Sequence, residues 1–281
     1  MNARRHAGFA CRACGGELRP GDGTPRWRAS ALRCADCDET IPVVDGIPRF
    51  PVPGGEPSGR DPFDRLAPIY ETPLWFRPLY RAIGGPTAPP DDRVLLARML
   101  EPDGRDALGD CRVLDVACGT GRFTRHVAGG AASVIGVDHS AEMLERARRY
   151  ADRAGTGGAN GTGPDGSERV AFARMSADRL WLADDAVDRA ACCWALHLFA
   201  EPDAALAEVH RVMRDGGRFA GATLTDRYLL AAAPMRAGAR HAIGAEPFAP
   251  AELHARLREA GFGEIEFDRR GAVLFFGARA E

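Results

Sequence analysis

The chain contains no lysine, and all 37 of its basic residues are arginine. A phosphate-binding P-loop requires a lysine after its glycine-rich turn, so this class of nucleotide site is excluded. The arginines are balanced by 39 acidic residues, which leaves a formal net charge of −2. This charge gives the chain no general attraction to nucleic acid.

The sequence also lacks a long hydrophobic run. It has no stretch of about 18 apolar residues to span a membrane. No apolar segment follows the first residues, Met1–His6, as a secretory signal would require. We therefore expect no membrane association and a cytoplasmic location. The 281 residues, of which 45% are hydrophobic, suffice for one large domain or for one domain and a small module.

The most informative segment is an apolar strand that enters a turn of small residues, Val113–Gly121, followed by a helix. About one strand later, Val134–Asp138 is a second apolar strand that ends in a carboxylate. The glycines let the backbone approach a ligand, and the acid is placed to accept hydrogen bonds from ribose hydroxyls. Thr124 occupies the place of the third glycine of a dinucleotide fingerprint, which argues against NAD.

The pattern Asp115-x-Ala117-x-Gly119-x-Gly121 resembles the first motif of class I S-adenosylmethionine (SAM) methyltransferases. The similarity runs from about residue 63 to residue 225, and the most similar patterns are those of quinone-biosynthesis-like and other small-molecule methyltransferases. The family usually has glycine where Ala117 stands. Alanine suits this position if its backbone angle is ordinary.

The resemblance implies SAM as the cofactor and assigns roles to individual residues. Asp138 would bind the ribose, Met143 would lie near the adenine, and Asp178 would hydrogen-bond the adenine amino group. His197 follows the fourth strand and is the candidate general base, with shaping of the pocket or bonding to the backbone as the alternative. The expected cofactor-binding residues are Asp115, Ala117, Cys118, Gly119, Gly121, Asp138, His139, Met143, Ala177, Asp178, Trp194 and Tyr70.

Two Cys-x-x-Cys pairs, Cys11 with Cys14 and Cys34 with Cys37, lie 19 residues apart. This spacing predicts a tetrahedral Zn²⁺ site, which would be structural because four thiolates leave no position for a catalytic water. Two disulfides or a ribbon without metal are the alternatives, and disulfides are disfavoured in a cytosolic protein. The following residues, Ile41–Phe50, resemble the end of a zinc ribbon that precedes several bacterial methyltransferases.

Strands and helices alternate, which predicts an α/β fold: a Rossmann-like seven-stranded methyltransferase sheet flanked by helices, plus a small N-terminal zinc ribbon. The expected parallel strands are 112–116, 133–137, 170–173, 189–193 and 218–223, with two antiparallel strands near 264–268 and 273–279. The expected helices are 91–100, 122–128, 141–153, 203–214 and 250–260, and the fourth stops at Gly216-Gly217. We divide the chain into a ribbon (1–50), a linker (51–62), a helical cap segment (63–100) and a SAM-binding domain (101–281), with a glycine-rich insertion at 155–167.

These features predict a SAM-dependent methyltransferase with a small-molecule acceptor, in secondary metabolism and natural product biosynthesis. The alternatives are a ribosomal RNA guanine methyltransferase, which also carries an N-terminal four-cysteine module, and a non-catalytic SAM-fold partner protein. Up to Gly59 the chain has eight arginines and seven acidic residues. This nearly balanced charge does not favour binding to the phosphates of RNA. Arg236, Arg240 and His241 lie in a stretch that often forms a substrate lid in this family, where they would meet an anionic substrate. The acceptor, the methylated atom and the oligomeric state are left open.

Overall fold

A computed structural model describes residues 8–21, 28–52, 70–72, 76–89, 91–101, 105–156 and 169–281. The predictions for most of the linker, for the start of the cap segment and for most of the glycine-rich insertion lie outside these residues. The division into domains therefore stays a prediction.

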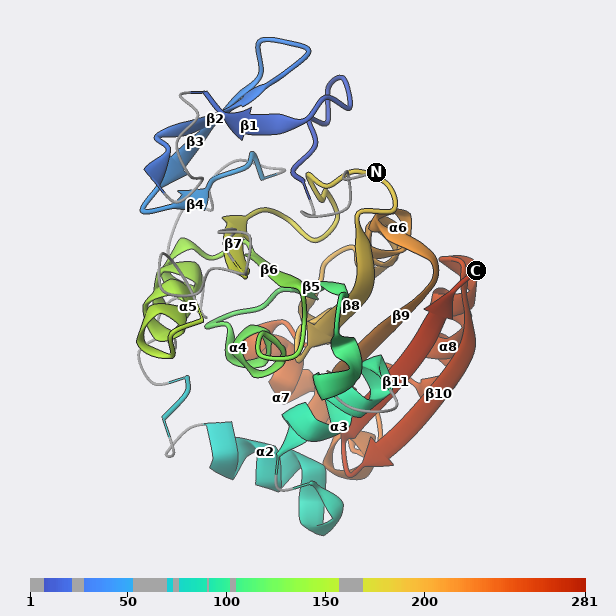
Figure 1. Ribbon diagram of the computed structural model, residues 1–281. Coiled ribbons are helices and arrows are strands. Elements are labelled where there is room, and N and C mark those ends of the chain that lie inside the picture. The colour runs from blue at the N-terminus through green and yellow to red at the C-terminus, as the bar shows by residue number, and fades with distance from the viewer. Residues whose placement is uncertain are drawn as a thin grey trace.

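A seven-stranded sheet forms the centre of the molecule (Figure 1), with the strand order β10-β11-β9-β8-β5-β6-β7. The strands are β5 (Arg112–Val116), β6 (Ser133–Asp138), β7 (Val170–Arg174), β8 (Val187–Cys193), β9 (Met213–Leu224), β10 (Phe262–Arg270) and β11 (Val273–Ala280). The first five run parallel, whereas β11 is antiparallel to both β9 and β10. The order reverses between β5 and β8, and open α/β sheets bind ligands at the carboxyl ends of strands beside such a reversal.

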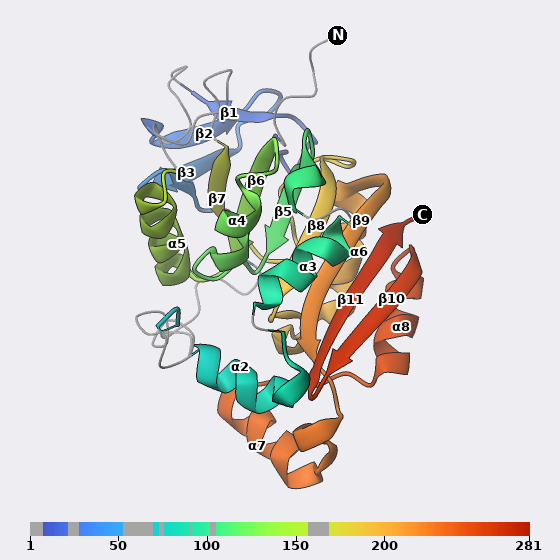
Figure 2. The ribbon, with the colours of Figure 1, turned by 60° about the horizontal axis from the view of Figure 1, so that its bottom comes forward.

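Neighbouring residues of each central strand enter different cores, as the two-residue repeat of a strand requires. Val113 packs with one set of helices, and Leu114 packs with the other set on the opposite face. The first face is covered by α3 (Asp92–Leu100), α4 (Arg122–Val127) and α5 (Ala141–Arg153), and the second by α6 (Pro202–Val212) and α8 (Pro250–Glu259) (Figure 2).

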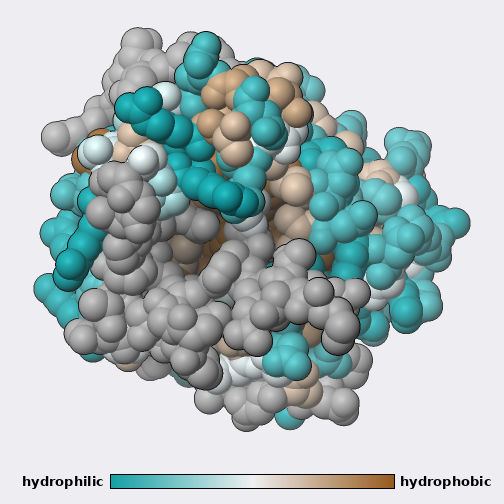
Figure 3. All heavy atoms as spheres, turned by 45° about the horizontal axis from the view of Figure 1, so that its top comes forward, coloured by the Kyte–Doolittle hydropathy of each residue, from teal (hydrophilic) through white to brown (hydrophobic). Residues whose placement is uncertain are grey.

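A small antiparallel sheet of four strands lies beside β7 (Figure 1). Its strands are β1 (Leu18–Pro20), β2 (Ala31–Cys34), β3 (Thr40–Val44) and β4 (Ile47–Pro48). From here on, the ribbon means the described residues 8–21 and 28–52, which include the first two residues of the predicted linker. Apolar residues of the ribbon belong to the same core as α6 and α8, so the two sheets share buried surface. Figure 3 turns this side forward and shows hydrophilic residues around a hollow in which hydrophobic ones are visible.

The remaining described helices are α2 (Phe76–Gly84) and α7 (Ala233–Ile243). Short 3₁₀ turns occur at η2 (Gly85–Thr87), η3 (Arg105–Leu108), η5 (Leu196–Leu198) and η6 (Tyr228–Ala231). In Figure 2, α2 and α7 lie beyond the lower ends of the strands. No helix among the described residues is long and apolar enough to cross a membrane.

The α/β class, the seven-stranded sheet and its order of strands and helices are confirmed. The predicted end of the fourth helix is wrong: α6 ends at Val212, and β9 already begins at Met213. Met213 pairs with Val187, and the register shifts before the next pair, so Gly216 and Gly217 lie in an irregular part of β9. The two glycines therefore belong to the register shift of β9 and not to the end of a helix. Gly216 has a φ of 73° in this shift.

Candidate functional site

The turn between β5 and α4 depends on backbone conformations that glycine adopts easily. Gly119 has a φ of 54° and Gly121 a φ of 72°, and Gly121 is the N-cap of α4. A Cβ at Gly121 would lie 3.1 Å from Cβ of Ala147 and 3.2 Å from the ring of Phe172. The turn is therefore packed closely against α5 and β7. The backbone groups of this turn lie at the end of β5.

Ala117 also lies in the left-handed region, with a φ of 52°. The condition under which alanine would suit this position, an ordinary backbone angle, is therefore not met. A residue with a Cβ is destabilised by about 1–2 kcal/mol in this conformation, which agrees with the glycine that the family pattern usually has at this position. The surrounding turn holds Ala117 in place, because the backbone N–H of Cys118 donates to Val137 O over 2.9 Å.

Asp138 at the end of β6 is fixed by the backbone on both sides. Its Oδ2 accepts from the N–H of Gly119 over 2.8 Å, and its Oδ1 accepts from the N–H of Ser140 over 2.9 Å. A carboxylate oxygen has two lone pairs and can accept more than one hydrogen bond. Nδ1 of His139, which is half-exposed, lies 3.7 Å from Oδ1. The fold thus brings the glycine turn and the predicted ribose-binding acid together.

A cavity of about 260 Å³ opens beside Asp138. Buried Oδ1 of Asp178 has no hydrogen-bond partner among the described residues. A buried acceptor of this kind fits the amino group of an adenine, which supplies the missing donor. The lining residues are Val52, Ala117, Val137, Asp138, His139, Met175, Ser176, Ala177, Asp178, Leu198, Phe199, Ala200, Glu201 and Ala205.

Two of the expected cofactor residues have structural partners away from this cavity. Asp115 is buried and accepts from the hydroxyl of Thr124 over 2.6 Å, and burial raises its pKa to about 7. Thr124, at the position of the third glycine, thus bonds one oxygen of this carboxyl, whereas the buried Oδ1 has no hydrogen-bond partner among the described residues. Met143 is buried in α5, and its N–H donates to the N-cap hydroxyl of Ser140 over 3.1 Å. A contact between Met143 and adenine stays a prediction.

The segment that contains Tyr70 is tied to the glycine turn. Glu71 accepts from the hydroxyl of Thr120 over 2.5 Å and pairs with Arg125 over 2.6 Å. Burial raises the pKa of Tyr70 to about 12, although the positive charge of Arg122 acts in the opposite direction. The neighbouring residue of Tyr70 is thus bound to the glycine turn, and a contact between Tyr70 and the cofactor stays a prediction.

A buried carboxylate that the sequence did not single out connects three elements. Asp92, at the start of α3, is fully buried and pairs with Arg122 of α4, and its Oδ2 accepts from Nε1 of Trp194 over 2.7 Å. Trp194 follows β8 with a φ of 68° and packs edge-on against Tyr80 at 5.5 Å. The sequence signal was the pair Asp91–Asp92, of which Asp91 is the N-cap.

His197 is buried in η5 and faces β9. The backbone N–H of Leu224 donates to its Nδ1 over 3.3 Å, and Oγ1 of Thr223 lies 3.1 Å from the same atom. Because a backbone N–H can only donate, the ring proton belongs on Nε2. Burial lowers the pKa of His197 to about 3. This geometry supports the backbone-bonding alternative, and general-base catalysis by His197 stays a prediction.

A second cavity, of about 750 Å³, lies between α7 and the start of α8. Arg236, Arg240 and His241 line it, but so do Asp226, Glu246 and Glu252. Arg240 pairs with Glu246, and Arg236 donates to the carbonyl of Ala231 over 2.7 Å. These arginines are therefore partly neutralised or hydrogen-bonded within the chain.

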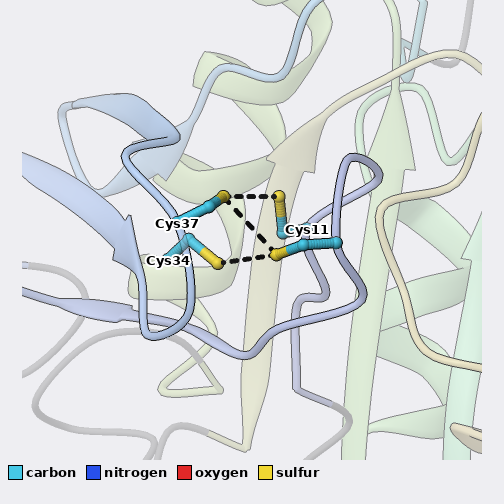
Figure 4. Close-up of side chains that lie close together, drawn as sticks. Cys11, Cys34 and Cys37 are labelled. Atoms are coloured by element: carbon cyan, nitrogen blue, oxygen red, sulfur yellow. Dashed lines mark hydrogen bonds between the residues drawn. The ribbon is translucent and has the colours of Figure 1, made fainter.

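The four ribbon cysteines converge, as Figure 4 shows for the labelled three. Their sulfurs all lie within 4.8 Å of one another, with Cys14 3.4 Å from both Cys34 and Cys37 and Cys11 3.7 Å from Cys37. Tetrahedral Zn²⁺ with bonds of about 2.3 Å places its sulfurs about 3.8 Å apart, close to these distances. All four cysteines are free thiols in this structure, so it does not contain the two disulfides considered above.

Backbone donors support both cysteine turns. The N–H of Gly16 donates to Sγ of Cys14, and the N–H of Asp36 donates to Sγ of Cys34, each over 3.4 Å. The second bond holds the pKa of Cys34 down to about 7. Donors aimed at sulfur stabilise thiolates, which is the form that binds metal. The residues present therefore fit a four-thiolate metal site.

The sheet order, the glycine turn and the acid at the end of β6 define a class I SAM-dependent methyltransferase fold. Residues 114–221 match the family model described as a methyltransferase domain. An uncharacterised chloroplastic methyltransferase of Arabidopsis thaliana is 30% identical over 76% of this chain and 61% of its own length. A demethylmenaquinone methyltransferase of Clavibacter sepedonicus is 34% identical over 38% of each chain.

Among solved structures, the Haloferax volcanii complex of the Trm112 methyltransferase activator with a methyltransferase has a similar fold. The TM-score is 0.53, with 21% identity, over 79% of this chain and 99% of that one. The chain spans less than two thirds of the length of the two sequence relatives. Residues 114–221 thus form a methyltransferase domain, and the seven-stranded sheet with its helices has the Rossmann-like methyltransferase fold.

Proposed function

We propose that this protein transfers a methyl group from SAM to a small-molecule acceptor. The main support is the arrangement at the end of β6: Asp138 is held by two backbone donors at the mouth of a cavity in which Asp178 has a buried acceptor atom. In this proposal Asp138 accepts hydrogen bonds from the ribose hydroxyls, and Asp178 accepts one from the adenine amino group.

The cofactor, when bound, supplies a methyl group already activated by its sulfonium. The chain's own residues then have to hold the nucleoside and exclude water, and such positioning can contribute several kcal/mol to the rate. Asp138 and Asp178 would orient the nucleoside. Tyr70 and Trp194 would border the reacting end, because Tyr70 lies near the glycine turn and Trp194 follows β8 at the switch in strand order.

Trp194 also marks the side from which an acceptor would approach. Trp194, Ile83 of α2 and Ala239 of α7 all pack against one small apolar cluster, which consists of Leu224, Leu230, Ala245 and Ala272. An apolar wall of this kind suits a small organic acceptor, and the quinone-type substrate in the name of the Clavibacter relative is consistent with that choice. A role in secondary metabolism is part of this proposal. A base is needed only if the acceptor must first lose a proton.

The four cysteines would hold one structural Zn²⁺. We expect metal analysis to find about one zinc per chain, and none in a variant that lacks Cys34 and Cys37. An RNA methyltransferase is the alternative that the ribbon favours. However, the ribbon buries part of its surface against the methyltransferase domain, and its charge is nearly balanced.

Calorimetric titration with S-adenosylhomocysteine tests cofactor binding. We expect Asp138→Ala to weaken binding about 100-fold, because charge-assisted hydrogen bonds contribute about 1.5–3 kcal/mol each. Asp152→Ala removes an exposed acid of α5 and should bind like the wild type. Absence of binding by the wild type would favour the non-catalytic alternative.

A labelled-methyl transfer assay tests the acceptor. The full chain is incubated with labelled SAM and, in parallel, host small-molecule extract or host RNA. We expect label in the small-molecule fraction, and label in RNA alone would overturn the proposed acceptor class.

A further inference from the structure

The ribbon is attached to the methyltransferase domain on both sides of the loop that enters the cofactor cavity, residues 175–178. Before the loop, the N–H of Phe50 donates to the carbonyl of Arg174 over 2.9 Å. After it, the N–H of Ala10 donates to the carbonyl of Trp181 over 2.9 Å, and Phe9 forms a β-bridge with Leu182. The ribbon therefore fixes the backbone at both ends of this loop.

Aromatic packing and an ion pair reinforce these attachments. The ring of Phe50 lies 5.1 Å from that of Phe9 and 5.2 Å from that of Trp181, and all three are buried. Arg12, between the first two cysteines, pairs with Glu208 over 3.0 Å. The same carboxylate accepts from the N–H of Leu180 over 2.8 Å, just beyond the loop.

The ribbon also reaches the cavity itself. Val52, two residues after Phe50, lines the cavity together with Asp138 and Asp178. In addition, Nε of Arg174 donates to the carbonyl of His139 over 2.9 Å, while its own carbonyl is held by Phe50. The ribbon is thus connected to the backbone beside the ribose acid.

The cysteine cluster lies next to these contacts. Cys11 directly follows Ala10, is 2% exposed, and belongs to the core that also contains Phe50 and Trp181. A metal ion that joins Cys11 to Cys34 and Cys37 would hold Ala10 and Arg12 in their docked positions. Without it, a module this small has little core of its own to maintain its fold.

We propose that the metal-bound ribbon is part of the cofactor-binding site: it positions residues 175–178 and contributes Val52, so that metal and cofactor bind cooperatively. This inference rests on the proposed function. Cooperativity must be reciprocal, so a metal that raises cofactor affinity is itself retained more strongly when the cofactor is bound.

The test uses the full chain, either loaded with zinc or depleted with a chelator. We expect S-adenosylhomocysteine to bind at least tenfold more weakly to the depleted protein. Saturating S-adenosylhomocysteine should lower the equilibrium transfer of zinc to a chromogenic chelator by the same factor. Equal affinity in both metal states, or zinc transfer that S-adenosylhomocysteine does not change, would overturn the proposal.

An arginine variant keeps the test valid if depleted protein unfolds. Arg12→Glu breaks the contact with Glu208 while leaving all four cysteines, and we expect severalfold weaker S-adenosylhomocysteine binding at full zinc content. Arg19→Glu is the matched control, because Arg19 pairs with exposed Glu17 inside the ribbon. Wild-type affinity in Arg12→Glu would contradict the proposal. Failure of zinc-loaded wild type to bind at all would instead contradict the proposed function.

Discussion

Nε1 of Trp194 donates to Oδ2 of Asp92 over 2.7 Å and so joins the end of β8 to the first turn of α3. The carboxylate also pairs with Arg122, the first residue of α4 after the glycine turn. One buried acid therefore fixes three segments around the switch point of the sheet.

We expect Asp92→Ala to lower the free energy of unfolding by about 3 kcal/mol, since it leaves Arg122 and the indole N–H without their partner. Asp91→Ala removes the N-cap bond, the ion pair with Arg93 and a longer contact of 4.0 Å with Arg122, and should cost about 1 kcal/mol. Urea unfolding followed by circular dichroism measures both. Equal losses in the two variants would show that Asp92 has no special role.

Ala117 tests the strain in the cofactor turn. Ala117→Gly should raise the free energy of unfolding by about 0.5 kcal/mol, because relief of the left-handed conformation outweighs the entropy of glycine. Ala117→Val should lower it by about 2 kcal/mol, since a β-branched residue fits this conformation poorly. Ala255→Gly, at an exposed position of α8, should instead lose about 1 kcal/mol. A loss in Ala117→Gly as large as in this control would contradict the interpretation.

Gly136 in β6 packs closely against Cys118, which belongs to the same turn as Ala117. A Cβ there would lie 2.9 Å from both Sγ of Cys118 and the ring of Phe172, so Gly136→Ala should lower the free energy of unfolding by about 2 kcal/mol. Gly129 has no neighbour within 4 Å of an added Cβ, and Gly129→Ala should change stability by less than about 0.5 kcal/mol. Thermal unfolding of the pair measures the difference, and similar melting temperatures would count against tight packing.

His197 should make the protein sensitive to acid. Its folded pKa of about 3 lies below the unfolded value, so the unfolded state binds more protons as the pH falls below about 6.5. The stability contributed by neutral His197 is therefore present at neutral pH and is lost toward pH 3. Asn can accept the Leu224 N–H without titrating, so at pH 5 the wild type should lose about 2 kcal/mol relative to His197→Asn. Urea unfolding at pH 7, 6 and 5 provides the comparison.

The opposite sign holds for Asp115, whose folded pKa of about 7 lies above the unfolded value. Its contribution is greatest below about pH 4 and declines as the pH rises toward 7. Parallel measurements on Asp115→Asn separate the two effects.

If methyl transfer by His197→Asn falls by more than a hundredfold at pH 7 with the fold intact, His197 acts in catalysis as well.

Sequence patterns alone predict the order and type of the main elements, the cysteine pairs and the acid of β6. These follow from short-range physics: apolar repeats, glycine in tight turns, and ligand types at fixed spacing. Even so, these patterns misplaced the end of α6, because pairing between Met213 and Val187 overrode the helical pattern. The contacts of Asp92, Glu71 and Val52 could not be predicted in this way, since their partners lie far away in the chain and meet them only in the folded protein. The left-handed angle of Ala117 was likewise decided by the turn that surrounds it, and not by alanine's own preference.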